Sequence, residues 1–153
     1  MTFKGPGSLA YVDTQFLIKE AGVKASEVLT RGDLCNGPFN QLAKIVTADA
    51  VLHGGFVQIA ETKTGTATNG GAVVDVILRG AKMIMKCANG LQSGQIVKLD
   101  VTAGVQKAIA ATGSAVAGGD IASGKVLGIF LHYVDSQLTE DGADGDNGVV
   151  QTL

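Results

Sequence analysis

The sequence predicts an all-β fold of short antiparallel strands. Its apolar residues fall in bursts of four to six, at residues 73–78, 83–87 and 96–99, which are too short for helices. Turn-forming residues separate these bursts, at Gly80 and at Asn89-Gly90, where an antiparallel chain must reverse. Three bursts joined by chain reversals are typical of a compact antiparallel sheet.

Residue alternation and composition support the same fold class. In the last burst Val97 and Leu99 alternate with Ile96 and Lys98, so at least one sheet face is expected to be buried. The 153-residue chain contains 22 glycines, about double the usual share of ~7%, and they are dispersed among the apolar bursts. This length fits one domain with a real core. Aromatic residues are scarce, so Val, Ile, Leu and Ala have to build that core.

The first 31 residues are predicted to form an extended N-terminal arm ahead of a β domain of residues 32–153. The apolar residues of the arm lack a sustained period and lie among Gly5-Pro6-Gly7 and isolated charges, so the segment buries itself poorly. An alternative stays open, namely a first strand and loop of the same domain. Residues 19–29 are equally compatible with a short helical turn or an extended anchor. The residues expected to contact a partner or a neighbouring subunit are Phe3, Tyr11, Phe16, Leu17 and Ile18.

Two strands are predicted in the first part of the β domain. Residues 42–46 form a candidate strand, and residues 54–60 form a clearer one. In the second strand the alternation places Phe56, Gln58 and Ala60 on one face and Val57 and Ile59 on the other.

The later part of the chain contains the strongest predicted strand, at residues 124–134. Residues 61–71 are rich in Thr, Gly and Asn and are expected to form a loop. Residues 101–119 are predicted as irregular strand and loop, because their glycines cost a helix up to ~1 kcal/mol each. After the acidic segment 140–148, residues 149–153 are predicted to return as a final edge strand.

Charge and hydropathy exclude several classes of partner. The net charge is -2, and Lys and Arg are scattered singly, so no basic stripe for phosphate neutralisation is seen. The apolar runs are far shorter than the ~18 residues needed to span a bilayer. The first seven residues lack the apolar core of a signal peptide. We therefore predict no nucleic-acid partner, no membrane partner and synthesis in the cytoplasm.

Two motifs come close to known chemistry without completing it. Residues 119–125 nearly spell a phosphate-binding loop, but Val126 stands where a hydroxyl must reach magnesium, and a strand pattern follows instead of a helix. Met85-Lys86 is similar to the pair that displays a carrier lysine in biotin-carrying domains, although Ile84 and Cys87 replace the flanking residues of that family. A solvent-facing strand lysine is the simpler interpretation of Lys86.

Metal sites and catalytic groups are not predicted either. The aspartates of segment 141–146 do not follow calcium-loop spacing. The cysteines and histidines are not paired at zinc-ligand spacing, and neither histidine lies in a recognisable triad. These residues are Cys35, Cys87, His53 and His132, and both cysteines are interpreted as buried free thiols. The sequence therefore predicts no enzyme, no cofactor and no metal.

Four glycine-spaced strand segments occur in an order that resembles the tailed-phage capsid cement, or decoration, proteins. In that family a strand ending in Gly-Val-Ala, a Val-rich strand closing on glycine, a Gly-Asp turn into a Val-x-Leu strand and a late Ile-Gly-Val-Ala strand follow one another. The corresponding segments here are 55–60, 74–80, 93–100 and 126–131. The resemblance covers about residues 32–134, and Gln95 replaces the family's aspartate.

The resemblance implies a small antiparallel β-barrel or β-tulip with an extended N-terminal arm. Such a protein assembles, as a homotrimer, on the exterior of an icosahedral phage head in the virion and bridges subunits of the major capsid protein. The arm would anchor on the capsid or a neighbouring subunit by adding a strand to a sheet edge. Deleting residues 1–18 is then expected to abolish head binding and leave the domain folded. The alternatives are a head fibre or tail component, and a small carrier domain using Lys86.

Overall fold

The structure is all-β and antiparallel, which confirms the predicted fold class. It is a computed structural model, and every regular element in its described residues is a strand. The described ranges are 5–7, 17–47, 56–112, 119–121, 123–134 and 142–153, with the backbone alone for residues 17–20. No helix in these ranges is long and apolar enough to cross a membrane.

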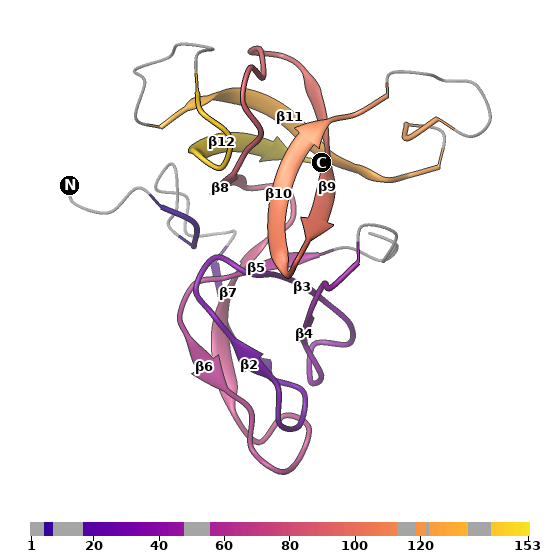
Figure 1. Ribbon diagram of the computed structural model, residues 1–153. Coiled ribbons are helices and arrows are strands. Elements are labelled where there is room, and N and C mark those ends of the chain that lie inside the picture. Colours follow the sequence, from indigo (N-terminus) through magenta and orange to yellow (C-terminus); the bar gives the residue numbers. More distant parts are fainter. Residues whose placement is uncertain (1–4, 8–16, 48–55, 113–118, 122, 135–141) are drawn as a thin grey trace.

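Two five-stranded sheets divide the chain at the Gly80 turn, where glycine has a φ of 101°. The first sheet, in the lower half of Figure 1, has the order β1 (Leu17–Gly22), β7 (Val73–Leu78), β5 (Val57–Ile59), β3 (Leu34–Asn36), β4 (Ala43–Lys44). The second sheet, in the upper half, has the order β10 (Val105–Ala110), β9 (Ile96–Thr102), β11 (Val126–Tyr133), β12 (Asn147–Thr152), β8 (Lys82–Lys86). A two-stranded sheet pairs β2 (Val28–Leu29) with β6 (Lys63–Thr64).

The second sheet curls until its two outer strands meet. Cys87, which follows β8, forms an isolated bridge with Ala108 of β10, and the Ala88 N–H donates to the Ala108 carbonyl at 2.8 Å. One bridge is not a strand pairing, and no closed barrel is found among the described residues. The architecture is therefore two stacked sheets, one of them strongly curled, where a barrel was expected.

The structure differs from the expected arm over residues 17–31. Leu17 and Ile18 pair with Ile77 and Val76 of β7, so β1 is an edge strand of the first sheet. Leu29 of β2 is fully buried. A turn at residues 25–26 joins β1 and β2, so residues 19–29 form no helical turn. This part of the chain follows the alternative of a first strand in the same domain, because the outer edge of β7 offers it backbone partners.

Residues 5–7 also lie against the domain. The side chain of Arg31 donates from Nε to the carbonyl of Gly7 at 3.3 Å. A Cβ on Gly32 would lie only 2.4 Å from the Cβ of Pro6, so the two segments are in close contact. Residues 1–4 and 8–16 are outside the described part of the chain.

The core consists of two apolar clusters. The larger one lies between the sheets and joins Leu34, Phe56 and Ile77 of the first half to residues such as Met83 and Phe130 of the second. The smaller one covers the opposite face of the first sheet; its members are Ala21, Val23, Leu29, Cys35, Leu42, Val57, Ile59, Ala72, Val74 and Val76. The first sheet is thus covered on both faces.

The predicted alternation in the strand at residues 54–60 is confirmed by this division. Phe56 and Ala60 pack in the cluster between the sheets, and Val57 and Ile59 pack in the outer cluster. Gln58 points the same way as Phe56, since its Nε2 donates to the Ile84 carbonyl at 2.7 Å.

The C-terminal strand is present as predicted but does not lie at an edge. β12 lies between β11 and β8, and its Val149 and Val150 are buried. The sequence pattern shows that residues 149–153 are extended, but it does not show that β8, some sixty residues earlier, pairs on the outer side.

Tyr133 fixes the predicted reversal at Asn89-Gly90. Its hydroxyl donates to the Ala88 carbonyl and accepts from the Leu91 N–H at 3.1 Å. Its ring packs on Phe130 with centroids 4.8 Å apart, so the turn is anchored to the core.

Candidate functional site

The five residues predicted to contact a partner fall into two groups. Phe3, Tyr11 and Phe16 lie outside the described residues. Leu17 and Ile18 lie in β1, where their backbone pairs with β7 of the same chain, and nothing is described of their side chains. The strand addition expected of this segment therefore occurs within the chain for these two residues, and the outer edge of β1 ends the sheet.

A cleft of about 310 Å³ lies between the two sheets, and we call it the inter-sheet cleft. One wall is the turn before β3 together with Lys44 of β4, and the other is formed by β8, the end of β9 and the start of β10. The lining residues are Pro6, Thr30, Arg31, Gly32, Asp33, Leu34, Lys44, Met85, Lys86, Leu99, Gly104, Val105, Gln106, Lys107 and Ala108. Its volume falls at the small end of the range for ligand pockets.

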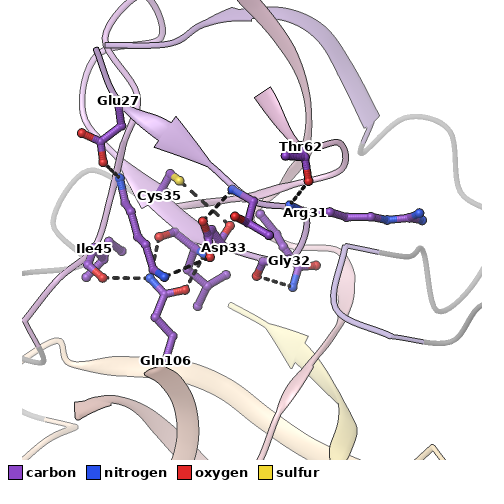
Figure 2. A network of polar contacts seen from close by, with 12 residues as sticks. Glu27, Arg31, Gly32, Asp33, Cys35, Ile45, Thr62 and Gln106 are labelled. Atoms are coloured by element: carbon purple, nitrogen blue, oxygen red, sulfur yellow. Dashed lines mark hydrogen bonds and ion pairs between the residues drawn. The ribbon is translucent and has the colours of Figure 1, made fainter. Parts of the chain in front are cut away.

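Gln106 spans the floor of the cleft and ties the sheets together (Figure 2). Its side-chain oxygen accepts from the Leu34 N–H at 2.7 Å, and its Nε2 donates to the carbonyls of Leu34 and Ile45 at 2.8 Å. The amide thus behaves as an extra strand residue beside β3. This gives the Leu34 N–H and the Ile45 carbonyl a partner at the junction between the sheets, and the Leu34 carbonyl, which also accepts from the Ile45 N–H at 3.0 Å, gains a second donor.

The turn on the first wall is held by Asp33. One carboxylate oxygen accepts from the Thr30 N–H at 2.8 Å, and the other lies 3.2 Å from the Lys44 Nζ. On the neighbouring residue, the Arg31 N–H donates to the Thr62 hydroxyl at 3.1 Å (Figure 2). Asp33 is the only carboxylate among the described lining residues, and it is already engaged by groups of its own wall.

Basic side chains are concentrated around this cleft. Four cations face one carboxylate there, although acidic residues outnumber basic ones, 14 to 12, in the whole chain. The cations are Arg31, Lys44, Lys86 and Lys107. Sequence reasoning missed them because they are single residues 13 to 42 positions apart, with no charge run to signal a cluster. Only the stacking of the two sheets brings them together.

The two cysteines are buried free thiols, as predicted. Burial raises the pKa of the Cys35 thiol strongly, and the carboxylates of Asp33 and Glu27 raise it further. Burial also raises the pKa of Cys87 to about 12, against a smaller opposite effect of a backbone hydrogen bond from Gly148. Both groups stay protonated near neutral pH, so neither has the thiolate character of a nucleophile.

The remaining motifs are placed as follows. Residues 119–125 lead into β11, so the near phosphate-loop pattern opens a strand and not a helix. The Asp120 carboxylate accepts from the Thr112 hydroxyl and N–H and lies 3.0 Å from the Lys98 Nζ. The Thr112 hydrogen bonds, followed by Lys98, hold the pKa of Asp120 well below its usual range. The Asp120 carboxylate thus stabilises the loop around it through these contacts.

Lys86 is the exposed last residue of β8 and lies opposite Asn147 of β12. The nearest turn, at Asn89-Gly90, comes later in the chain, so Lys86 is not presented at a hairpin tip as a carrier lysine is. Asp144 forms an ion pair with Lys107 at 2.9 Å, and Asp146 accepts from the Ala143 N–H at 2.8 Å. Within the described ranges, no group of three or more His, Cys, Asp and Glu side chains could hold a metal ion.

No protein-family model matches the sequence, and neither the curated proteins nor the solved structures contain a significant match.

Proposed function

We propose that this protein is a structural capsid cement protein that binds the exterior of an icosahedral phage head. In this role it bridges major capsid subunits, as a homotrimer, and stabilises the shell against the pressure of packaged DNA. The protein then acts through its surfaces and its rigidity, without catalysis.

One observation carries the proposal: the four segments that resemble the cement family overlap four of the inner strands of the two sheets. Segments 55–60 and 74–80 overlap β5 and β7, which pair directly in the first sheet. Segments 93–100 and 126–131 overlap β9 and β11, which pair directly in the second. A resemblance produced by scattered glycines would have no reason to select two hydrogen-bonded pairs at equivalent inner positions.

The architecture also suits a protein that has to withstand mechanical force. Both sheets are antiparallel and share one apolar cluster, and the Gln106 amide adds polar cross-links between them. Interlocked sheets resist shear because sliding them requires the packed side chains and the buried hydrogen bonds to separate together.

The capsid-binding test has to be designed around β1. Deleting residues 1–18 removes two residues that pair with β7, so it would damage the sheet as well as the arm. The triple variant Phe3→Ala, Tyr11→Ala, Phe16→Ala leaves β1 intact. Its binding to empty heads assembled from the cognate major capsid protein is measured by co-sedimentation, and the mass in solution by light scattering.

The expected result is that the wild-type protein forms a trimer and co-sediments with heads, whereas the triple variant keeps its melting temperature and loses binding. Phe39→Ala, which changes an exposed phenylalanine of the described domain, serves as the matched control and is expected to bind normally. A wild-type monomer that ignores heads would overturn the proposed function. Normal binding by the triple variant would overturn the role of the arm alone.

A further inference from the structure

The inter-sheet cleft has one exposed cation, Lys86, whose charge no described residue compensates. Of its four cations, Lys44 is paired with Asp33 at 3.2 Å, and Lys107 is paired with Asp144 at 2.9 Å. Lys86 is exposed and has no ion-pair or hydrogen-bond partner among the described residues. The Asp33 carboxylate also accepts a hydrogen bond from the Thr30 N–H. The described lining of the cleft therefore carries more positive charge than Asp33 neutralises.

The same cleft exposes part of a strand edge. Val105 and Thr102 flank the two-residue turn Ala103-Gly104, so the backbone of Val105 and Lys107 faces β9 and that of Gln106 faces outward. The Gln106 N–H and C=O have no hydrogen-bond partner among the described residues, while the outward carbonyl of Ala108 is already used by Ala88. One residue of an extended chain can therefore pair with the edge of β10 inside the cleft.

The remaining lining restricts the class of ligand. Met85, Leu99 and Pro6 supply apolar surface, and none of the described lining residues is aromatic. Single-stranded nucleic acids are held largely by stacking of bases on aromatic side chains, and the described lining offers no such platform. A polypeptide instead uses a strand edge, apolar contacts and isolated cations together.

We propose that the inter-sheet cleft binds an extended, carboxylate-rich polypeptide segment of a partner protein. The segment pairs its backbone with Gln106 of β10 and places its carboxylates near Lys86 and the other cations of the rim. This inference goes beyond the proposed function, because it rests on the chemistry of the cleft and holds wherever the protein acts.

The test uses the full-length protein and a fluorescently labelled hexaglutamate peptide at low ionic strength. Binding is expected to shift the backbone amide resonances of residues 85–86 and 104–108 and to weaken as salt is added. A hexaglutamine peptide, which keeps the backbone and loses the charge, is expected to bind at least about tenfold more weakly. Inorganic phosphate and oligothymidylate are competitors that should not displace the peptide.

Charge reversal at one cleft residue supplies the matched comparison. Lys86→Glu is expected to weaken hexaglutamate binding about tenfold, and Lys86→Gln about fivefold. Lys24→Glu makes the same change in net charge at an exposed residue outside the cleft lining and is expected to change the affinity less than about twofold. Both positions are exposed, so the three variants should keep the melting temperature of the wild type.

Any of four results would overturn the inference. The first is absence of hexaglutamate binding, and the second is equal weakening by Lys24→Glu and Lys86→Glu. The third is a set of amide shifts outside the cleft. The fourth is displacement by oligothymidylate or phosphate at comparable concentration, which would show a general anion site. None of these measurements uses heads, so their failure is distinguishable from failure of the proposed capsid role.

Discussion

The two sheets bury their strands in different ways. In the first sheet β5 is covered on both faces, with Gln58 directed toward the second sheet and Ile59 packed in the outer cluster. In the second sheet β9 alternates, with Val97 and Leu99 buried and Lys98 half-buried. An antiparallel sheet requires cover on one face only. The additional cover of the first sheet comes from β2 and from the segments joined at the Val23–Leu42 bridge.

Gly65 and Gly90, one in each half, require glycine for different reasons. A Cβ on Gly65, beside the outer cluster, would stand 2.3 Å from the Lys24 carbonyl oxygen, so glycine is needed there for close approach of two backbones. A Cβ on Gly90, in the second half, would meet nothing within 4 Å, and the φ of 69° is what favours glycine. Close packing thus explains the glycine at position 65, and turn geometry explains the one at position 90.

The largest effect is expected from the core between the sheets. Phe130→Ala removes a fully buried ring that packs on Tyr133, and should lower the free energy of unfolding by about 3–5 kcal/mol. Phe39→Ala is the control, because that ring is 54% exposed and should change stability by less than about 0.5 kcal/mol. Urea unfolding followed by circular dichroism measures both. Similar losses in the two variants would contradict the placement of the core.

The loss of stability at alkaline pH can be used to compare the two halves, because Cys35 lies in the outer cluster and Cys87 lies in the cluster between the sheets. Each thiol has a higher pKa in the folded protein than in the unfolded chain, where it is about 8.5. The stability that the protonated thiol contributes is therefore fully present below about pH 8.5, and it falls as the pH rises toward the folded pKa. The expected loss is about 1.4 kcal/mol per pH unit for each thiol. Urea unfolding between pH 7 and pH 10 measures it.

Cys35→Ala and Cys87→Ala separate the contributions of the two thiols. Each variant should lose about half of the alkaline sensitivity. In the folded wild type neither thiol should react with a disulfide reagent at pH 8, and reaction should follow unfolding. Rapid labelling of a single thiol in the native protein would show that its half of the molecule opens independently.

Loss of the Gln106 hydrogen bonds between the sheets should have a smaller effect on the free energy of unfolding. Gln106→Ala leaves the backbone groups of Leu34 and the carbonyl of Ile45 without these partners, and should cost about 1–3 kcal/mol. Hydrogen exchange should accelerate at the Leu34 amide before other amides of β3. Gln92→Ala, at an exposed turn, is the control and should leave both quantities unchanged. Unaltered exchange at Leu34 would refute the bridging role of the glutamine.

The two glycines give the smallest and most direct test of the comparison. Gly65→Ala forces a methyl group onto a backbone carbonyl and should destabilise by about 1–3 kcal/mol. Gly90→Ala meets no atom and should cost only the positive-φ penalty of about 1 kcal/mol. Thermal unfolding ranks the two variants. The reverse order would mean that close approach does not explain the glycine at position 65.

The sequence alone determined the strands and their reversals. Short bursts, period-two alternation and glycine turns are local properties, so β5 and β11, which lie within the predicted segments 54–60 and 124–134, and the Asn89-Gly90 turn could be predicted from neighbouring residues alone. The same alternation placed Gln58 on the face of Phe56 and Val97 on the face of Leu99, and all four side chains are buried.

Only the tertiary structure decided which strands became neighbours. Leu17–Gly22 is predicted as part of an arm because its own residues carry no information about the free edge of β7. The final strand is predicted as an edge strand because its own residues do not indicate that β8 pairs with it. The inter-sheet cleft depends on the same non-local pairing. Its cations, at positions such as Lys44 and Lys86, are unremarkable one by one, and they form a charged site because stacking two sheets brings distant residues to one rim.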